Sequence, residues 1–318
     1  MPPTPLGPAL PPHLAAEPSE HFPTSASYEL KGHEGPVYAV RFNSQGTYCM
    51  SCGKDRTLRL WNPHTGRLVK TYTGHGYDVR DVTVTKDNSK FASCGGDKQV
   101  FVWDVGSGKI IRKLRGHDAP INAITQGAGD EVLVTGSYDQ AVKVWDCRSR
   151  SFDPVQVMTD ASDSVTSVTT NTAGGRAEVA AASVDGGVRR YDIRMGRLFT
   201  DALHVPVTHL AVSRDGAMLL AACMDSCIRL LDRAEGDLLM EFRGHKHAST
   251  RIECCLSPTD AHVFGASEDG RVCIWDLASG EMVESHQAHS DSVCSMALHP
   301  EGSTLCTSSV DGLIKVWV

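Results

Sequence analysis

The chain has 318 residues, of which 41% are apolar and 22% are charged, an ordinary composition for a globular protein of one large or two smaller domains. Its formal charge of −7 argues against a protein that grips nucleic acid over a wide basic surface, so we expect no direct, sequence-specific contact with nucleic acid. No apolar run approaches the ~18 residues of a membrane-spanning helix, and we expect no membrane partner.

The first 26 residues differ in composition from the rest of the chain. They contain eight of the fifteen prolines and neither lysine nor arginine. A signal or transit peptide needs a basic start or an arginine-rich amphipathic segment, so neither is supported. We expect residues 1–26 to form a Pro-rich disordered tail, followed by one folded domain over residues 27–318.

Seven copies of one unit follow the tail. The clearest copy, residues 74–104, opens with Gly-His, continues through short apolar runs and an aspartate turn, and closes with Trp-Asp. In every copy the turn aspartate is followed six residues later by a large side chain. The pairs are Asp55 and Trp61, Asp97 and Trp103, Asp139 and Trp145, Asp185 and Tyr191, Asp225 and Leu231, Asp269 and Trp275, and Asp311 and Trp317.

This repeat predicts the fold. A period of about 40–45 residues with a Gly-His and Trp-Asp signature is typical of a propeller blade of four strands. The sequence therefore predicts an all-β protein, a single seven-bladed β-propeller with four-stranded antiparallel blades. The last copy ends at Val318, one residue after its tryptophan, whereas residues 27–30 resemble the outer-strand runs 68–72 and 238–242. We predict that the N-terminal strand completes the last blade, closes the ring and removes its two open edges.

The repeats resemble those of the WD-repeat propellers, over residues 27–318. In that family a His, a strand Ser or Thr, the turn Asp and the Trp form a hydrogen-bonded set inside a blade. The resemblance implies full sets in repeats one, two, three and seven. They are His33, Ser51, Asp55 and Trp61; His75, Ser93, Asp97 and Trp103; His117, Thr135, Asp139 and Trp145; and His289, Thr307, Asp311 and Trp317. Repeat six has Gly265 at the hydroxyl position and should have a partial set. Repeats four and five, with Ala181 and Ala221 there, lack the His and the Trp as well.

Catalysis and metal binding are both disfavoured. A Ser, His and Asp in one neighbourhood could suggest a hydrolase, but the trio recurs in several repeats, whereas catalysis needs one privileged copy. The eleven cysteines are scattered and mostly lie in or beside apolar runs, which favours a reducing compartment. Cys49 and Cys52 have the only zinc-like spacing, and no second pair follows them. We expect no enzymatic activity, no cofactor and no metal.

Exposed side chains on one rim are the candidates for partner binding. By resemblance to WD-repeat propellers, these positions flank the first valine-like residue after Gly-His or directly precede the turn aspartate. The candidates are Tyr38, Lys54, Arg80, Asn122, Tyr138 and Glu268. Tyr38, Arg80 and Tyr138 stand out because Tyr and Arg are enriched among interface anchors. The competing candidate is a basic surface on blades three and four, formed by Arg148, Arg150, Arg189 and Arg190. His209 follows an apolar stretch and has no set to serve.

Less generic strings narrow the resemblance. TYTGHGYDVRDV, VKVWDCRSR, DGGVRRYDIRMGRL and RLLDRAEGDLL are similar to the mitogen-activated protein kinase organizer family. That resemblance implies a monomeric, non-enzymatic scaffold of the cytoplasm and nucleus. The partners it implies are a kinase signalling module, components of the late spliceosome and, in animals, a hypoxia-linked prolyl hydroxylase. A substrate-recognition subunit of a ubiquitin ligase or a translation-factor subunit is the alternative function.

Overall fold

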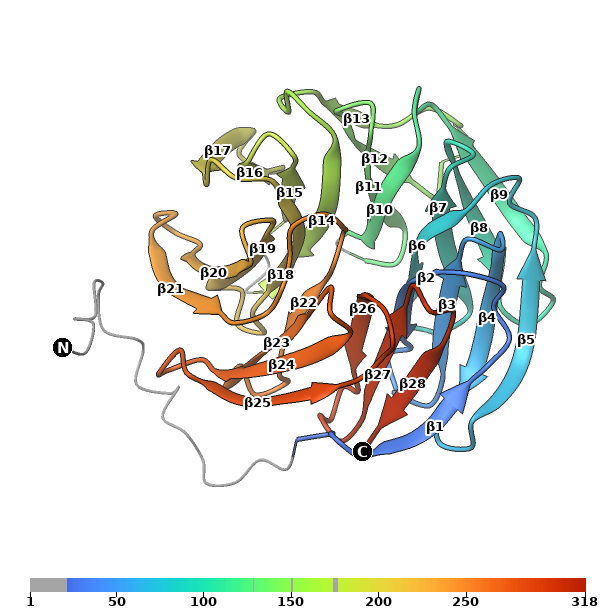
Figure 1. Cartoon of the computed structure of the whole chain (residues 1–318). Coiled ribbons are helices and arrows are strands. Elements are labelled where there is room, and N and C mark those ends of the chain that lie inside the picture. The colour runs from blue at the N-terminus through green and yellow to red at the C-terminus, as the bar shows by residue number, and fades with distance from the viewer. Residues whose placement is uncertain (1–21, 128, 150, 174–176) are drawn as a thin grey trace.

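The computed structural model describes residues 22–127, 129–149, 151–173 and 177–318, and these residues form a ring of seven four-stranded antiparallel sheets (Figure 1). The predicted all-β, seven-bladed propeller is confirmed. Residues 1–21 of the predicted tail, and Arg150 of the predicted basic surface, lie outside the described residues.

In blades one to six the strands follow one another in chain order from the channel to the outside, and in blade seven β1 is the outer strand. Blade one has β2 (Val37–Phe42), β3 (Cys49–Gly53), β4 (Thr57–Asn62) and β5 (Arg67–Thr73). Blade two has β6 (Val79–Val84), β7 (Lys90–Gly95), β8 (Gln99–Asp104) and β9 (Ile110–Arg115). Blade three has β10 (Ile121–Gln126), β11 (Val132–Ser137), β12 (Val142–Asp146) and β13 (Gln156–Met158). Blade four has β14 (Val165–Asn171), β15 (Glu178–Ser183), β16 (Gly187–Asp192) and β17 (Arg197–Ala202). Blade five has β18 (Val207–Val212), β19 (Met218–Cys223), β20 (Cys227–Asp232) and β21 (Leu238–Arg243). Blade six has β22 (Cys254–Leu256), β23 (His262–Ala266), β24 (Arg271–Asp276) and β25 (Met282–Gln287), and blade seven has β26 (Val293–Leu298), β27 (Leu305–Ser309), β28 (Ile314–Trp317) and β1 (Ala26–Leu30).

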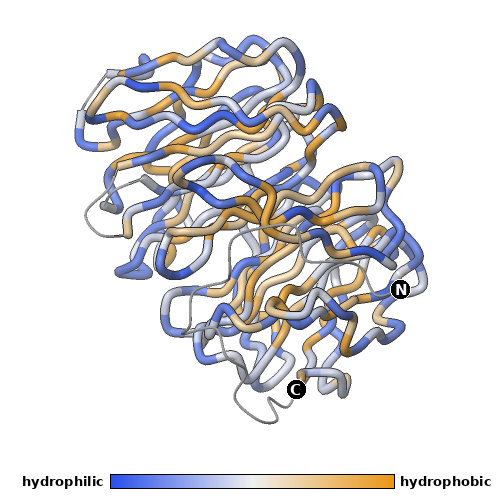
Figure 2. The backbone as a smooth tube through the Cα atoms, turned by 90° about the vertical axis from the view of Figure 1, so that its left-hand side faces the viewer, coloured by the Kyte–Doolittle hydropathy of each residue, from blue (hydrophilic) through white to orange (hydrophobic). Residues whose placement is uncertain are grey.

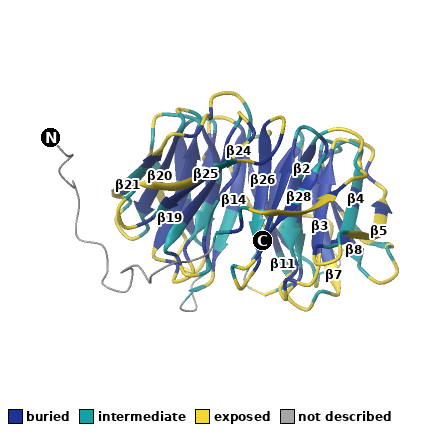
Figure 3. Ribbon diagram, turned by 60° about the horizontal axis from the view of Figure 1, so that its bottom comes forward, coloured by how far each residue is buried: buried dark blue, intermediate teal, exposed yellow. Residues whose placement is uncertain are grey.

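Burial along a blade explains its sequence pattern. The second strand is covered on both faces by neighbouring blades, so β3 and β19 are buried at every position, and β19 is a continuous apolar run. The outer strand is covered on one side at most, and β17 is exposed at five of its six positions. Figures 2 and 3 show the same gradient, with buried, apolar strands inside the ring and hydrophilic, exposed turns at its rims.

The core lies between the blades rather than in one central cluster. One such cluster packs Cys94 and Val100 of blade two against Ile121 and Ile124 of blade three. Another packs Leu30 and Ile314 of blade seven against Val37 of blade one. Each blade is therefore stabilised chiefly by its two neighbours, which makes ring closure a condition for burying every apolar face.

Ring closure occurs through the N-terminal strand, as predicted. β1 pairs antiparallel with β28, with Leu30 opposite Ile314 and Glu29 opposite Lys315. Phe22, which we assigned to the tail, also lies on the ring, because its side chain packs edge-on against His262 at 4.8 Å between ring centroids. The described residues that contact the ring therefore extend back to Phe22, before the expected boundary at residue 27.

Candidate protein-interaction site

Four blades contain the same hydrogen-bonded set of side chains. In blade one the Trp61 indole N–H donates to Ser51 Oγ over 2.8 Å. Because that oxygen accepts from Trp61, the Ser51 hydroxyl is free to donate to His33 Nε2, also at 2.8 Å. His33 Nδ1–H then donates to Asp55 Oδ2 over 2.9 Å. The sets of blades two, three and seven are His75, Ser93, Asp97 and Trp103; His117, Thr135, Asp139 and Trp145; and His289, Thr307, Asp311 and Trp317.

These sets fix the loops on one face of the ring. The Asp139 carboxylate also accepts the backbone N–H of Asp118 over 2.9 Å, so it ties the turn before β12 to the loop before β10. Burial alone would raise the pKa of Asp139, but the hydrogen bond and the charge of His117 outweigh it and lower this pKa to about 2. The aspartate is therefore ionised near neutral pH, and the loops on this face are held by charge-assisted bonds.

Blades four, five and six depart from this arrangement. In blades four and five the turn aspartate pairs with an arginine four residues later, Asp185 with Arg189 at 2.8 Å and Asp225 with Arg229 at 2.6 Å. In blade six Gly265 supplies no hydroxyl, and both ring nitrogens of buried His245 lack a hydrogen-bond partner among the described residues. Trp275 instead donates to the backbone oxygen of Arg243 over 3.0 Å.

A β-bulge at the start of the inner strands aims selected side chains at the channel mouth. The pairing register shifts between Val37 and Ala39 in blade one, and at the corresponding places in blades two to five and seven. A bulge re-aims the residue it contains and tightens the local twist. The bulged residues are Tyr38, Arg80, Asn122, Thr166, Thr208 and Cys294.

Four of these bulged residues surround one hollow. It measures about 290 Å³ and is lined by Tyr38, Asp78, Arg80, Asn122, Arg251 and Cys294. Arg80 donates to Asn122 Oδ1 over 2.7 Å and to Asp78 Oδ2 over 2.9 Å, so its guanidinium is held in place before any partner arrives. Burial, and then the charge of Asp78, raise the pKa of Tyr38, which stays a neutral phenol at physiological pH. We call this hollow the channel-mouth hollow.

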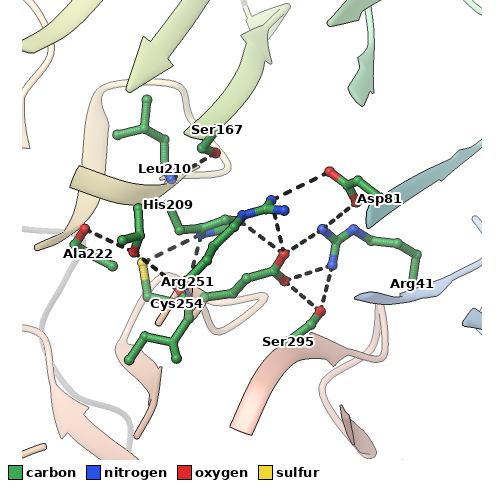
Figure 4. A network of polar contacts seen from close by, with 12 residues as sticks. Arg41, Asp81, Ser167, His209, Leu210, Ala222, Arg251, Cys254 and Ser295 are labelled. Carbon is green, nitrogen blue, oxygen red and sulfur yellow. Dashed lines mark hydrogen bonds and ion pairs between the residues drawn. The ribbon is translucent and has the colours of Figure 1, made fainter. Parts of the chain in front are cut away.

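Arg251, which lines the channel-mouth hollow, also belongs to an ionic network inside the channel (Figure 4). Arg41 makes two parallel hydrogen bonds to Glu253, each at 2.8 Å, and a third to Asp81 at 2.9 Å. Arg251 donates to the Asn122 backbone oxygen over 2.7 Å, and its guanidinium lies 3.6 Å from Glu253. The network joins blades one, two, three and six across the channel. Its side chains also line a second space of about 540 Å³ between the inner strands.

Neighbouring arginines keep Glu253 ionised although it is buried, whereas burial raises the pKa of Asp81 in the same network. Burial alone would raise the pKa of Glu253, but the positive charge of Arg41 dominates and lowers it to about 2. His209 lies beside the network, 3.9 Å from Glu253, and burial lowers its pKa to about 4. His209 belongs to no blade set, as expected, but its ring is buried and its Nδ1 accepts the Cys254 N–H over 3.4 Å.

Comparison with known proteins identifies the family. Residues 25–62 and 280–318 match the family "WD domain, G-beta repeat". Residues 77–256 match the family "Nucleolar protein 10-like, N-terminal domain". WD repeat domain-containing protein 83 of Rattus norvegicus is 54% identical over 304 residues, which are 95% of each chain. The human protein is 53% identical over 284 residues, 89% of each chain. The chain belongs to the WD repeat domain-containing protein 83 family.

Membership of this family agrees with the propeller structure described above. A homologue of Dictyostelium discoideum is 32% identical over 317 residues, 92% of this chain and 98% of that protein, so the whole propeller is shared. The WD-repeat propeller is generally a non-catalytic scaffold that mediates protein–protein contacts, and no enzymatic family matches. The protein is thus a WD-repeat scaffold.

The remaining rim candidates lie outside the channel-mouth hollow. Lys54 and Tyr138 are exposed, Tyr138 to 62%, but neither lines it. Glu268 uses its carboxylate internally, since one oxygen accepts the backbone N–H groups of Ser249 and Thr250 over 2.6 and 2.7 Å. Burial would raise the pKa of Glu268, but these bonds lower it to about 2. Sequence reasoning missed Arg251, because the stretched loop before β22 hides its alignment with the other repeats.

The competing basic surface of blades three and four is not free. Arg190 is 4% exposed and donates to Asp201 Oδ2 over 2.9 Å, while Arg189 is paired with Asp185. These two arginines are therefore neutralised inside blade four, which the sequence could not show because Asp201 pairs across strands. Arg148 is exposed, and lies instead between blades two and three.

Neither a metal site nor a membrane-spanning helix is present in the described part of the chain. Cys49 and Cys52 both lie on β3 but pack into different inter-blade clusters. Residues three apart on a strand point to opposite faces, so the zinc-like spacing cannot bring these two thiols together.

Proposed function

We propose that this scaffold binds partner proteins at the channel-mouth hollow, in assemblies of pre-messenger-RNA splicing and of mitogen-activated protein kinase signalling. The observation that carries the proposal is the convergence of Tyr38, Arg80 and Asn122, each on a bulge, around one hollow. Tyr and Arg supply much of the energy at protein interfaces. The two named assemblies rest on the resemblance of the sequence to the mitogen-activated protein kinase organizer family.

Pre-organisation supports this surface over the others. Blades one to three contain complete His, hydroxyl, Asp and Trp sets, and the Arg80 guanidinium is already bonded to Asp78 and Asn122. Ordering an arginine on binding costs about 0.5–1.5 kcal/mol, and a side chain that is already fixed avoids most of this cost. We also propose that the protein is a monomer found in cytoplasm and nucleus, as two such roles require.

The test is affinity purification from cells, followed by mass spectrometry, with a Tyr38→Ala/Arg80→Glu variant. The matched control is Tyr48→Ala/Arg214→Glu, which changes the same residue types at exposed positions in turns on the opposite side of the ring. We expect wild type and control to retain spliceosomal and kinase-module proteins and the Tyr38/Arg80 variant to lose them. Retention of all partners by that variant would remove the channel-mouth hollow as the site.

The identity of the purified proteins tests the cellular role separately. Enrichment of cullin adaptors or of translation factors, with neither splicing nor kinase components, would favour the alternative function of a ubiquitin-ligase or translation-factor subunit. Fractionation of the same cells into cytoplasm and nucleus, and the molar mass of the purified protein in solution, check the compartments and the monomer.

A further inference from the structure

An apolar groove lies between blades one and two, at the end of β2 that is opposite to the channel-mouth hollow. It measures about 400 Å³, within the range of ligand-binding clefts. We call it the blade one–two groove. Its floor is formed by Met50, Leu60, Val84 and Val105, and its rim by Tyr48 and Val69. Tyr48 is 39% exposed and Val69 51% exposed, so the groove leaves an apolar surface open to solvent.

Strand pairing places the floor residues on facing surfaces of the two blades. Met50 pairs with Leu60, and Leu60 with Lys70, so these three side chains project from one face of blade one. That face turns toward blade two, because Met50 and Leu60 pack in the same cluster as Val84 and Val105. The groove is therefore the open end of the apolar interface between the two blades.

Hydrogen bonds hold the walls of this groove in place. Lys70 donates to the Val105 backbone oxygen over 3.2 Å, which fixes the turn between β8 and β9 against β5. The Tyr48 N–H donates to Asn43 Oδ1 over 2.9 Å, which fixes the turn between β2 and β3. In contrast, the Tyr48 hydroxyl and the Gln45 side-chain amide have no hydrogen-bond partner among the described residues. The groove thus combines a pre-organised apolar floor with free donors at its rim.

The matching space between blades two and three is polar instead. It measures about 290 Å³, and its lining includes the residues that follow those of the blade one–two groove by 42 positions. Lys90 stands there in place of Tyr48, and Gln126 in place of Val84. Charged and amide side chains suit a surface that only water covers. The apolar lining is therefore specific to the blade one–two groove and is not imposed by the repeat.

The first 21 residues of the chain contain a pattern that fits such a groove. Proline recurs at every third position, as Pro2, Pro5, Pro8 and Pro11, and residues 3, 6, 9 and 12 are apolar as well. A polyproline II helix has three residues per turn, so each of these two sets would form a ridge, with the two ridges side by side. Its backbone has no internal hydrogen bonds, and segments of this kind dock in apolar grooves that contain aromatic side chains.

Length and charge allow these residues to reach the groove. Phe22 packs against His262, beside the turn between β22 and β23, which lies on the same side of the ring as the turn between β2 and β3. The 21 residues before Phe22 span up to about 70 Å when extended, whereas a folded body of this size is about 50 Å across. They contain two glutamates and neither lysine nor arginine, while Lys70 and no carboxylate line the groove.

We propose that the blade one–two groove is a binding site for polyproline II segments and that residues 2–12 of this chain occupy it. Leu6 and the prolines on either side of it cover the floor at Met50, and the Tyr48 hydroxyl and the Gln45 amide donate to their backbone oxygens. The connecting residues keep the segment at a high effective concentration, in the millimolar range, so that even a weak contact is formed most of the time. The groove shares no lining residue with the channel-mouth hollow and does not depend on the function proposed for it.

Photocrosslinking in the full-length protein locates the segment. Benzoylphenylalanine takes the place of Leu6, the protein is irradiated, and mass spectrometry of its peptides identifies the attached residues. We expect cross-links within one molecule to the lining residues, Met50 among them, and at least about a tenfold loss of these cross-links in Tyr48→Ser/Val69→Asp. The matched control is Tyr77→Ser/Ile111→Asp, which changes similar side chains at exposed positions outside the groove and should leave the cross-links unchanged.

Competition in the full-length protein measures occupancy. A fluorescein-labelled synthetic peptide of residues 1–14 is titrated by fluorescence polarisation with wild type and with Leu6→Asp/Leu10→Asp, whose own segment can no longer cover the apolar floor. Because the wild-type segment competes from the same chain, the peptide should bind the Leu6/Leu10 variant at least about tenfold more tightly than wild type. Adding Tyr48→Ser/Val69→Asp to that variant should abolish this binding.

Each alternative outcome overturns the proposal. Cross-links from position 6 to residues outside the groove would place the segment elsewhere. Cross-links that join two molecules, seen as a doubled mass, would assign the groove to a second copy of the chain. Equal affinity of the peptide for wild type and for the Leu6/Leu10 variant would mean that the groove is empty in the free protein and open to a proline-rich segment of a partner. Thermal unfolding of each variant shows that a lost contact is not lost folding.

Discussion

Ser25 and Val318 exchange two main-chain hydrogen bonds, of 3.2 and 2.9 Å, and so join the segment before β1 to the C-terminal residue. They extend the pairing of β1 with β28 beyond Ala26, and they close the ring with backbone bonds, which do not depend on side-chain identity. Residues 25–30 therefore carry the last blade's outer strand, while Phe22 anchors the chain on blade six.

Truncation should separate the anchored strand from the residues before it. Removing residues 1–21 should leave the melting temperature nearly unchanged. Removing residues 1–31 exposes the edge of β28, and the loss of Leu30 uncovers the apolar side chains that pack against it. This truncation should lower the melting temperature by at least about 5 °C. Differential scanning calorimetry of the two truncations makes the comparison, and equal melting temperatures would contradict the role of β1.

His117→Ala should destabilise the protein much more than His64→Ala. His117 is buried and joins Asp139 to Thr135, so its loss leaves each of these two groups one hydrogen-bond partner short, at a cost of roughly 1–3 kcal/mol. His64 is exposed in the turn between β4 and β5. Urea unfolding midpoints measure both effects. A His117→Ala midpoint equal to that of wild type would mean that the set of blade three contributes no net stability.

Glu253→Ala should be among the most destabilising single changes. It leaves the partly buried Arg41 guanidinium, whose side chain is 26% exposed, without the carboxylate that holds it at 2.8 Å. Breaking a fully buried ion pair by removing one partner costs about 3–5 kcal/mol, so we expect a loss toward the lower end of that range. Glu281→Ala removes an exposed carboxylate of the same blade and is the control. If chemical denaturation gave the two variants the same free energy of unfolding, the network would not hold the channel together.

Stability should fall as the pH is lowered from about 7 to 4. Burial lowers the pKa of His209 and of His245 to about 4, below the ordinary value of about 6.5 for an unfolded chain. Between these values the unfolded state binds more protons than the folded one, so the stabilisation is complete above pH 6.5 and is lost as the pH falls through 4. The loss is on the order of 3 kcal/mol for each histidine.

The free energy of unfolding in urea at pH 7, 6, 5 and 4.5 measures this dependence. His245→Gln should reduce the slope only in part, because burial lowers the pKa values of other histidines as well, among them His209, His247 and His289. The carboxylates of Asp55 and Asp139, with pKa values of about 2, weaken only at lower pH. A slope between pH 7 and 4.5 that is flat in wild type would show that neither histidine is buried uncharged.

Local pattern in the sequence was sufficient for the blades and the hydrogen-bonded sets. The six-residue step from Asp55 to Trp61 spans one turn and one strand, and His33 reaches them from the same blade. Ring closure could also be predicted from the sequence, because the last repeat lacks an outer strand and an additional strand precedes the first repeat. These features depend on contacts inside a single blade or on counting strands, so a repeat of 40–46 residues contains them.

The channel and the surfaces depended on the tertiary structure. Arg41 and Glu253 come from blades one and six, and their pairing exists only because a closed ring brings inner strands together across its centre. Whether a basic side chain is available to a partner is likewise decided by its neighbours. Arg190 is neutralised by Asp201 on the adjacent strand, whereas Lys113 on β9 is exposed. A repeat pattern specifies where a side chain lies within its blade. The charge that faces it belongs to a strand or blade distant in sequence, and only the packed ring determines which one that is.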